Sequence, residues 1–249
     1  MNERQSQLAS LFKESVSTAC GDPTRAQSAL FPEEEALVSD ASPSRRLEFL
    51  EGRACAHAAL RKLGYDEAPI LRGKDRQPRW PSGFVGSISH TDSFCAVAVA
   101  RETDCAGLGL DVETDLPVSE DFARRVCSER ELLRCAQHGS SAQLARVVFS
   151  AKESVYKLQH PLSGIVLYWR DLEVLLGDGH FTARFLTACP PFQIGQELVG
   201  RWCRSRGSCE SLQRPGLIFT GLELAVPPSK LCKTPARYGV DSCAHEGPE

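Results

Sequence analysis

Two carboxylates stand close together in the stretch GLGLDVET, residues 107–114. Asp111 and Glu113 are two positions apart at the end of an apolar run, and in a β-strand such residues point to the same face. Like charges on one face repel each other and raise one another's pKa. A divalent cation removes that repulsion, and Mg²⁺ binds carboxylate oxygens together with phosphates and water. The pair therefore suggests a metal site open to a phosphorylated ligand, the alternative being two solvated side chains on an edge strand.

A second charged pair lies in FSAKESVYK, residues 149–157. Glu153 and Lys157 are four positions apart, so they share one face of a helix. As a surface salt bridge they would contribute only about 0.3–0.5 kcal/mol, and this is the simplest interpretation. Beside a metal, however, a third carboxylate would add a ligand, and the ammonium would neutralise a phosphate oxygen.

Further polar and basic residues suit a phosphorylated ligand, although each alone is commonly just a solvated group. The stretch GSISHT ends a predicted strand with Ser89 and His90, which could both reach a phosphate. Arg46 and Arg53 lie seven apart on a predicted helix and share a face. The turn-rich loop that follows offers more positive charge for phosphates, from Arg72, Lys74 and Arg76.

Four ordered motifs between residues 45 and 157 give the sequence a family resemblance. GLGLDVE resembles the G-[IL]-D-x-E signature of 4′-phosphopantetheinyl transferases, and FSAKESVYK resembles their (W/F)-S-x-K-E-[SA]-x-x-K helix. WPSGFVGSISHT and RRLEFLEGRACAHAAL are similar to the two other motifs of the Sfp and enterobactin synthetase component D-like branch. Phe149 stands where many members have Trp. The chain length matches this monomeric branch, not the short trimeric synthases.

The resemblance implies roles for particular residues. The implied metal-binding acids are Asp111, Glu113 and Glu153, and the implied catalytic residues are Asp111, Glu153 and Lys157. The implied coenzyme A-binding residues are Arg45, Arg46, Arg53, Arg72, Gly73, Lys74, Asp75, Arg76, Ser89, His90, Asp111, Lys152, Glu153 and Lys157.

The resemblance also implies a reaction. A Mg²⁺-dependent enzyme, with Mn²⁺ as an alternative metal, would transfer the 4′-phosphopantetheine moiety of coenzyme A to a serine of an apo carrier protein. Adenosine 3′,5′-bisphosphate would be released. The partners would be acyl, peptidyl or aryl carrier domains of fatty-acid, polyketide or nonribosomal-peptide synthases, including siderophore pathways. Two other functions stay open at this point: a Mg²⁺-dependent nucleotide pyrophosphohydrolase, and a non-catalytic regulatory module that binds coenzyme A.

The elements that would position these residues form an α+β pattern. A helix is expected from Ser44, as N-cap, to a stop at Gly64, followed by strands at FVGSISH, FCAVAVAR and AGLGLDVE. The stretch CSERELLRCAQ has a capping-box pattern, with Ser128 followed three positions later by Glu131, and LARVVFSAKESVYKLQ is expected to be a helix ended by Pro161. The segments IVLYWRDLEVLL, HFTARFLT, ELVGRWCRS and GLIFTGLELAV suggest a second sheet.

The family fold implied is a monomer of two similar halves related by a pseudo-twofold axis, with the active site between them. Residues 1–110 would form the half that binds the nucleotide of coenzyme A, and residues 111–226 the half with the acids and the catalytic helix. Residues 227–249, with four prolines and no periodicity, are expected to be disordered.

Composition excludes several other classes of protein. The 249 residues carry a formal net charge of −3, so no global basic field favours nucleic acid. No window approaches 18 consecutive apolar residues, and the start lacks a signal-peptide pattern, so a cytoplasmic protein without a membrane span is expected. The 11 cysteines show no C-x2-C ligand pair, which favours free thiols in a reducing compartment.

Overall fold

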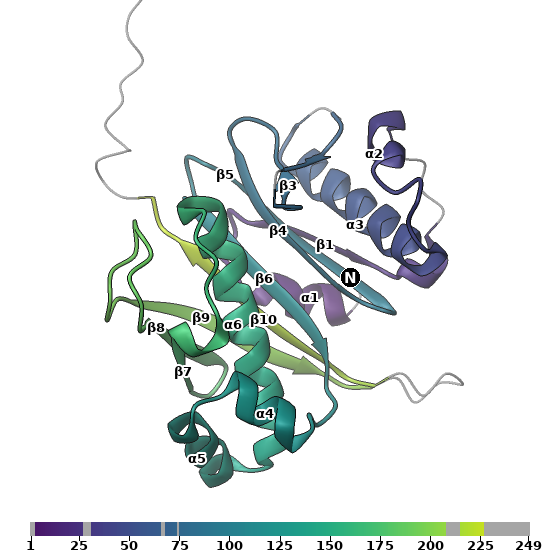
Figure 1. Cartoon of the computed structure of the whole chain (residues 1–249). Helices are drawn as coiled ribbons and strands as arrows, with labels where there is room; N and C mark the ends of the chain where they lie inside the picture. The colour runs from purple at the N-terminus through teal and green to yellow at the C-terminus, as the bar shows by residue number, and fades with distance from the viewer. Residues whose placement is uncertain (1–2, 27–30, 66–67, 74, 208–214, 227–249) are drawn as a thin grey trace, which may run out of the picture.

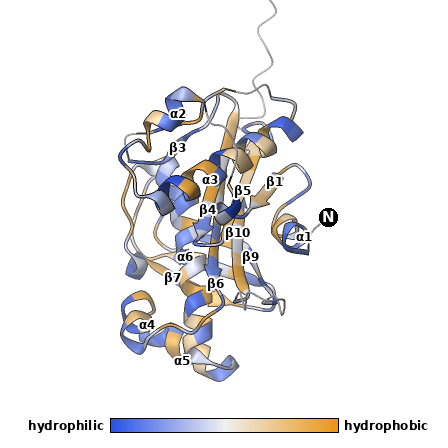
Figure 2. Cartoon of the chain, turned by 90° about the vertical axis from the view of Figure 1, so that its right-hand side faces the viewer, coloured by the Kyte–Doolittle hydropathy of each residue, from blue (hydrophilic) through white to orange (hydrophobic). Residues whose placement is uncertain are grey.

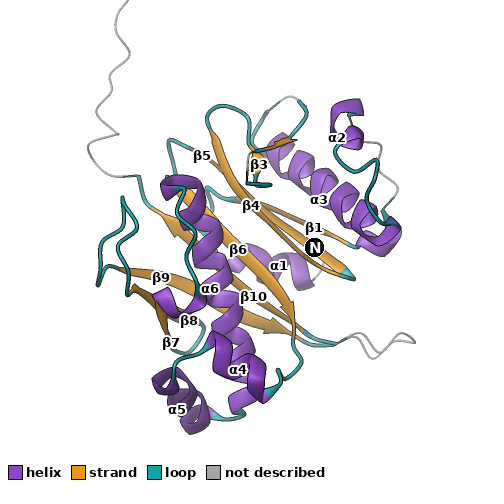
Figure 3. Ribbon diagram, in the orientation of Figure 1, coloured by secondary structure: helices purple, strands orange, loops and turns teal. Residues whose placement is uncertain are grey.

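The computed structural model describes residues 3–26, 31–65, 68–73, 75–207 and 215–226. Lys74 and the segment 227–249, for which disorder was expected, lie outside these residues. Both helices and antiparallel sheets are present, as Figures 1 and 3 show, so the α+β prediction is confirmed. In the described part of the chain, no helix combines the length and apolar character that crossing a membrane requires.

The first sheet has the strand order β1-β5-β4, from β1 (Ser17–Gly21), β5 (Phe94–Arg101) and β4 (Phe84–Thr91), and every pairing is antiparallel. The hairpin between β4 and β5 turns at residues 92–93. Helix α3 (Pro43–Lys62) packs on one face, where it buries Ala56, Ala59 and Leu60 against alternate residues of β5. The remaining small elements are α1 (Glu3–Ser10), η1 (Pro23–Arg25), α2 (Pro32–Ala36), β2 (Leu71–Arg72) and β3 (Pro78–Arg79).

The second sheet has five antiparallel strands in the order β6-β10-β9-β8-β7. They are β6 (Gly107–Thr114), β7 (Leu172–Leu176), β8 (His180–Phe185), β9 (Glu197–Ser205) and β10 (Leu217–Leu224). The long helix α6 (Ser141–Ser163) crosses one face of this sheet, with α4 (Glu120–Val126), α5 (Glu129–His138) and η2 (Trp169–Asp171) at its side. The apolar face of α6 packs into one core with β7 and β8.

The two sheets meet along β4 and β6, which run side by side without a backbone ladder between them. Serine hydroxyls of β4 replace the missing partners, because Ser87 Oγ accepts the backbone N–H of Leu110 at 3.1 Å and Ser89 Oγ accepts that of Val112 at 3.2 Å. Behind this seam, residues of the two sheets and of the N-terminal segment share a single apolar cluster. Figure 2 shows β5, the central strand of the first sheet and the partner of β4, as largely hydrophobic.

Several boundaries differ from the sequence predictions. Helix α3 begins at Pro43 with Ser42, not Ser44, as N-cap, because proline fits the first helical turn and Ser42 Oγ accepts from the backbone of Arg45. Gly64 is the stop that the sequence predicts, with φ of 72°. Helix α6 continues through Pro161 to Ser163 and ends at Gly164 in the left-handed conformation, since a proline so near the end removes only one helical hydrogen bond.

Two further differences concern strands. The segment 165–176 is a strand only over Leu172–Leu176, because Asp171 Oδ2 accepts from the backbone N–H of Tyr168 and closes a 3₁₀ turn. Strand β1 was not predicted in the first forty residues. The change from one sheet to the next falls in residues 102–106, shortly before the boundary expected at 110/111. The described cysteines are all free, as expected for that part of the chain.

Gly109 determines how closely β6 approaches α6. A Cβ added there would lie 1.9 Å from the backbone oxygen of Ser154, whereas at Gly107 the nearest atom is a Leu162 methyl carbon at 3.2 Å. The backbone of a helix cannot move aside, whereas the end of a leucine side chain can. Packing therefore requires glycine at position 109, the second glycine of the GLGLD motif, more than at position 107.

We predict that Gly109→Ala lowers the free energy of unfolding by about 1–3 kcal/mol, the usual range for overpacking. Gly107→Ala, the matched control two residues away, should cost less than about 1 kcal/mol because a leucine side chain has room to adjust. Urea unfolding of the two variants measures the difference. Equal losses would show that the β6–α6 distance does not depend on Gly109.

Candidate active site

Asp111 is the centre of the site. It lies on β6, is 4% exposed, and accepts three hydrogen bonds from side chains. Lys157 Nζ donates to Oδ1 at 2.7 Å and Ser89 Oγ donates to the same oxygen at 2.9 Å, while Ser150 Oγ donates to Oδ2 at 2.7 Å. The structure thus brings together Asp111, Ser89 and Lys157, which the sequence motifs place far apart along the chain.

Glu113 lies on the same face of β6 as Asp111, as the strand periodicity predicts. Its Oε2 accepts a hydrogen bond from Arg146 Nη1 of α6 at 2.9 Å. Burial raises the pKa of Glu113 to about 7, and the negative charge of Asp111 adds to the shift, while Arg146 opposes it. The like-charge repulsion that the sequence suggests is therefore present between these two acids.

Glu153 approaches the same region from α6. Its Oε1 accepts a hydrogen bond from the indole N–H of Trp169 at 2.7 Å, and burial raises its pKa while this hydrogen bond lowers it. The nearby charge of Asp111 raises the pKa of Glu153 further. Trp169 in turn packs against Phe149 and Phe122, with ring centroids 5.8 Å and 6.0 Å away. The aromatic residue at position 149 therefore supports the tryptophan that contacts the acid.

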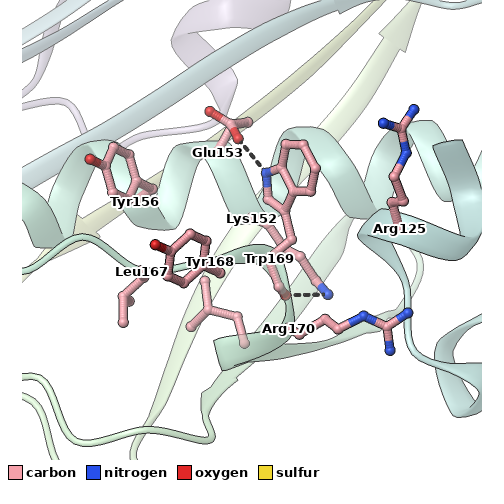
Figure 4. A pocket seen from close by; sticks show the side chains of 9 residues that line it. Arg125, Lys152, Glu153, Tyr156, Leu167, Tyr168, Trp169 and Arg170 are labelled. Atoms are coloured by element: carbon pink, nitrogen blue, oxygen red, sulfur yellow. Dashed lines mark hydrogen bonds between the residues drawn. The ribbon is translucent and has the colours of Figure 1, made fainter.

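A cavity of about 420 Å³ opens beside Glu153 (Figure 4). Its lining is mainly aromatic and aliphatic, with two arginines: Arg125, Lys152, Glu153, Tyr156, Leu167, Tyr168, Trp169, Arg170 and Leu172. The close-up shows Glu153 and Tyr156 on the same helix, with the segment that carries Tyr168 and Trp169 facing them. Such a cavity suits an elongated ligand of low charge whose reactive end reaches the acid.

The three acids suit a hard cation by their chemistry, since all their donors are carboxylate oxygens. Within the described residues, no group of three or more acids, histidines or cysteines is already gathered closely enough to hold a metal. Protein cations and donors occupy the acids instead: Lys157 on Asp111, Arg146 on Glu113 and Trp169 on Glu153. A divalent cation would relieve the repulsion that Asp111 exerts on Glu113 and Glu153.

A line of cationic groups leads away from Asp111 toward the first sheet. His90, on β4 next to Ser89, accepts a hydrogen bond from Arg45 Nη1 at its Nε2, 2.7 Å away, because a guanidinium only donates. Burial lowers the pKa of His90; the charge of Glu48 opposes this shift, and the charges of Arg45 and Lys157 add to it. The cations Lys157 and Arg45 thus lie on either side of His90, and Glu48 Oε2 pairs with Arg45 Nη1 at 3.0 Å.

Arg53 and Arg72 lie farther along the same half. The guanidinium of Arg53 is 4.4 Å from the centroid of the Phe49 ring, and that of Arg72 is 5.8 Å from it. Arg53 is buried, with Nε 3.8 Å from Glu34 Oε1, and burial lowers its pKa to about 10. The sequence does not predict that Glu34 pairs with Arg53, because the two residues are far apart along the chain and no local repeat relates them.

The remaining predicted nucleotide contacts differ in their surroundings. Gly73 donates its backbone N–H to Gln77 O at 2.7 Å and accepts from Arg76 N at 3.1 Å, so the loop is closed by its own backbone. Asp75 lies 4.0 Å from His160 Nε2 on α6. Arg46 points away from this line toward Glu35, 3.9 Å away.

Lys152, a predicted coenzyme A-binding residue, makes its hydrogen bonds within the protein. Its side chain is almost fully buried, and Nζ donates to Glu131 at 3.0 Å, Val126 O at 2.9 Å and Trp169 O at 2.8 Å. An ammonium has three N–H donors, and here protein oxygens take all three. Lys152 therefore braces α4, α5 and η2, and through the backbone of Trp169 it supports the contact to Glu153.

Two site residues were missed by the sequence analysis although a signal existed. Arg146, Ser150, Glu153 and Lys157 follow one another at intervals of four, three and four residues, so they form a single stripe along α6. A search from Glu153 toward the start of the helix would have found Arg146 and Ser150.

A carboxylate strand, a helix with an acid and a lysine, and neighbouring cationic side chains thus meet in an α+β protein, an arrangement that suits phosphorylated ligands. Comparison with known proteins agrees. Residues 33–100 match the 4′-phosphopantetheinyl transferase N-terminal domain, and residues 107–207 match the 4′-phosphopantetheinyl transferase superfamily.

Individual relatives carry the same name. The chain is 39% identical over 208 residues to the 4′-phosphopantetheinyl transferase Svp of Streptomyces mobaraensis, covering 80% of each chain. It is 32% identical over 190 residues to the 4′-phosphopantetheinyl transferase Npt of Nocardia iowensis, covering 71% of this chain and 85% of that protein. Enterobactin synthase component D of Escherichia coli K12 matches at 35% over 125 residues, 49% of this chain and 58% of its own. The chain therefore belongs to the 4′-phosphopantetheinyl transferase superfamily, in its Sfp and enterobactin synthase component D-like branch.

We predict that the acid pair makes stability depend on pH when divalent metal is absent. The folded-state pKa of Glu113 is raised from 4.5 to about 7, so the folded chain binds more protons and loses stability as the pH rises through this window. Glu113→Gln removes this titrating group. As the pH rises from 4.5 to about 7, the free energy of unfolding of the variant should therefore increase relative to that of the parent by on the order of 1–3 kcal/mol. Urea unfolding in EDTA measures it, with the exposed Glu197→Gln as control. A constant difference between Glu113→Gln and parent would contradict the prediction.

We predict a large stability loss for Lys152→Met, about 3–5 kcal/mol, because it leaves Glu131 buried and charged without its partner. The double variant Lys152→Met with Glu131→Gln should recover part of the loss. Lys13→Met removes a surface ion pair from a side chain that is 68% exposed, and should cost less than about 1 kcal/mol. Denaturant unfolding of the three variants provides the test, and a Lys152→Met variant as stable as Lys13→Met would refute it.

Proposed function

We propose that this transferase moves the 4′-phosphopantetheine moiety of coenzyme A to a serine hydroxyl of an apo carrier protein and releases adenosine 3′,5′-bisphosphate. The observation that carries the proposal is the junction of β6 and α6, where Lys157 contacts Asp111 and the acids Glu113 and Glu153 stand nearby. An anionic diphosphate needs both kinds of group: a cation held by the carboxylates, and an ammonium for its own oxygens.

The line of positive charge supports coenzyme A as the donor. Coenzyme A carries a diphosphate and a separate 3′-phosphate, and in this proposal Lys157, His90 and Arg45 would contact these anionic groups. Arg72 and Arg53 would supply the far end, toward the 3′-phosphate and the base. In this proposal residues 1–110 hold the nucleotide and residues 111–226 hold the reacting diphosphate.

Asp111, Glu113 and Glu153 would hold Mg²⁺, with Mn²⁺ as an alternative. When bound, the ion would act as a Lewis acid that draws charge from the diphosphate. Lys157 would then turn from Asp111 to a phosphate oxygen; its side chain is 28% exposed, which leaves it room to do so. There it would stabilise the negative charge on the departing phosphate.

The cavity beside Glu153 would take the pantetheine arm, whose amides and thiol carry no charge at neutral pH. The carrier serine would attack the phosphorus attached to the arm, and the bond from that phosphorus to the bridging diphosphate oxygen would break. The serine proton would pass to Glu153, directly or through a water, because burial raises the pKa of this carboxylate and so makes it a better base. The nucleophile thus belongs to the partner.

The partner would be an acyl, peptidyl or aryl carrier domain of a fatty-acid, polyketide or nonribosomal-peptide synthase, siderophore synthases included. Its modified serine must reach Glu153, and exposed side chains lie near the cavity on that side, such as Tyr168 at 74% exposure. We propose that the chain acts as a monomer in the cytoplasm, since one chain supplies both the acids and the cationic line.

The test is to incubate the chain with coenzyme A, MgCl₂ and an apo carrier domain, and then to weigh the intact carrier. A mass gain of one phosphopantetheine group, with release of adenosine 3′,5′-bisphosphate, is the expected result. Loss of coenzyme A without carrier modification would indicate a pyrophosphohydrolase instead. No reaction, together with binding of coenzyme A, would indicate a regulatory module.

We predict which variant loses this activity. Asp111→Ala should abolish carrier modification while the chain still unfolds cooperatively, because the carboxylate that joins Ser89, Ser150 and Lys157 is gone. Asp178→Ala, in an exposed turn of the second sheet, should keep parental turnover. Near-parental modification by Asp111→Ala at ordinary Mg²⁺ would disprove the role of this acid.

A further inference from the structure

Thr220 lies in the C-terminal part of the chain, where no diagnostic motif is visible. It is on β10, directly opposite Asp111 of β6 in the antiparallel register, and it is completely buried. Residues opposite each other in neighbouring strands project to the same side of the sheet. A buried hydroxyl therefore stands beside the central acid of the site, on the side where α6 crosses.

The hydroxyl of Thr220 contacts the helix residue that holds the acid. Thr220 Oγ1 is 2.9 Å from Ser150 Oγ and 2.9 Å from the backbone oxygen of Ser150. Ser150 Oγ is in turn 2.7 Å from Asp111 Oδ2. The three side chains come from β10, α6 and β6, so the chain of contacts crosses the three elements that build the site.

The direction of this chain follows from counting protons. An ionised carboxylate only accepts, so Ser150 must give its single hydroxyl proton to Asp111. Ser150 Oγ then has only lone pairs to offer Thr220, and Thr220 must donate to Ser150, either to its hydroxyl or to its carbonyl. Whether the Thr220 proton goes to the hydroxyl or to the carbonyl of Ser150, Thr220 holds this residue beside Asp111, and Ser150 donates to Asp111.

The two oxygens of Asp111 are held differently. Ser89 and Lys157 both donate to Oδ1, whereas Oδ2 receives its hydrogen bond from Ser150. Ser89 cannot compensate, because its one proton is already on Oδ1 while its oxygen accepts from Val112 N. The plane of the carboxylate therefore depends on Ser150 and on whatever fixes the Ser150 hydroxyl.

We propose that Thr220 is a positioning residue for the transfer reaction: it holds Ser150 in place, and the Ser150 hydroxyl orients the carboxylate of Asp111 toward a bound divalent cation. This inference rests on the proposed function, which supplies the first measurement, turnover. The second measurement is Mg²⁺ binding and does not need turnover. A purely structural hydroxyl would affect stability alone.

The experiment compares Thr220→Val with Thr220→Ser. Valine has the shape of threonine without the hydroxyl, and serine keeps the hydroxyl without the methyl group. With coenzyme A and an apo carrier domain at limiting MgCl₂, Thr220→Val should turn over about tenfold more slowly, the factor expected for one lost buried hydrogen bond. The KM for coenzyme A at saturating MgCl₂ should change less than twofold. Thr220→Ser should stay within about threefold of the parent.

Ser154→Ala is the matched control. Ser154 is also fully buried on α6, one turn beyond Ser150, but its hydroxyl donates only to the helix carbonyl of Ala151 at 2.8 Å. It should lose melting temperature to a similar degree as Thr220→Val while turnover stays parental. If Thr220→Val does not fold, Ser150→Ala with Thr220→Ser tests the same hydrogen bonds.

A second measurement is independent of turnover. MgCl₂ alone should raise the melting temperature of the parent, because it binds the folded chain, and should raise that of Thr220→Val less. If the parent protein binds Mg²⁺ but leaves the carrier unmodified, the proposed function is wrong. The role of Thr220 is still tested in that case, by comparing the Mg²⁺-induced rise in melting temperature between the parent and Thr220→Val. Thr220→Val with parental turnover and a parental Mg²⁺ shift would overturn the inference, as would a loss that Thr220→Ser does not restore.

Discussion

The site depends on hydrogen bonds between β4 and β6, two strands of different sheets that lie side by side without a backbone ladder. Buried backbone N–H groups without partners are costly, and here the hydroxyls of Ser87 and Ser89 accept those of Leu110 and Val112. The same Ser89 hydroxyl donates to Asp111. One side chain thus closes the seam between the halves and holds the central acid, so the active site cannot form unless the halves are joined.

Buried charge serves a different purpose on the far side of α6. The ion pair of Lys152 and Glu131 gains little net stability over an apolar pair, because both charges lose their hydration. It does impose geometry: Glu131 also accepts the backbone N–H groups of Ser128 and Val174, and Lys152 fixes the carbonyl of Trp169. The acid Glu153, which is held by the Trp169 indole, is therefore positioned in part by this buried ion pair, through the carbonyl of Trp169.

Local patterns were enough to predict much of this structure, and the failures have a common cause. The spacing of Asp111 and Glu113, the i, i+4 pair Glu153 and Lys157, and the Ser128 capping box are local, and each was found where expected. The ion pair of Lys152 was not predicted because its partner Glu131 lies on another helix, and the sequence around a lysine does not show which buried acid it will meet. Thr220 and Glu34 were missed because their roles arise only from strand register and tertiary packing. The motifs identified the family; the contacts that hold the motif residues in place are visible only in the fold.

The stripe of Arg146, Ser150, Glu153 and Lys157 has a consequence for how such a protein could diversify. An α-helix rises 1.5 Å per residue, so the stripe extends about 16 Å along a continuous helix. The spacing of its charges is set by helix geometry and does not depend on the loops at either end. The wall of the cavity, in contrast, is partly formed by residues 167–170, which follow the helix as non-helical chain and a 3₁₀ turn. Sequence change at residues 167, 168 or 170 would alter the wall of the cavity while the groups on α6 keep their spacing, whereas Trp169 in the same segment is constrained because its indole holds Glu153.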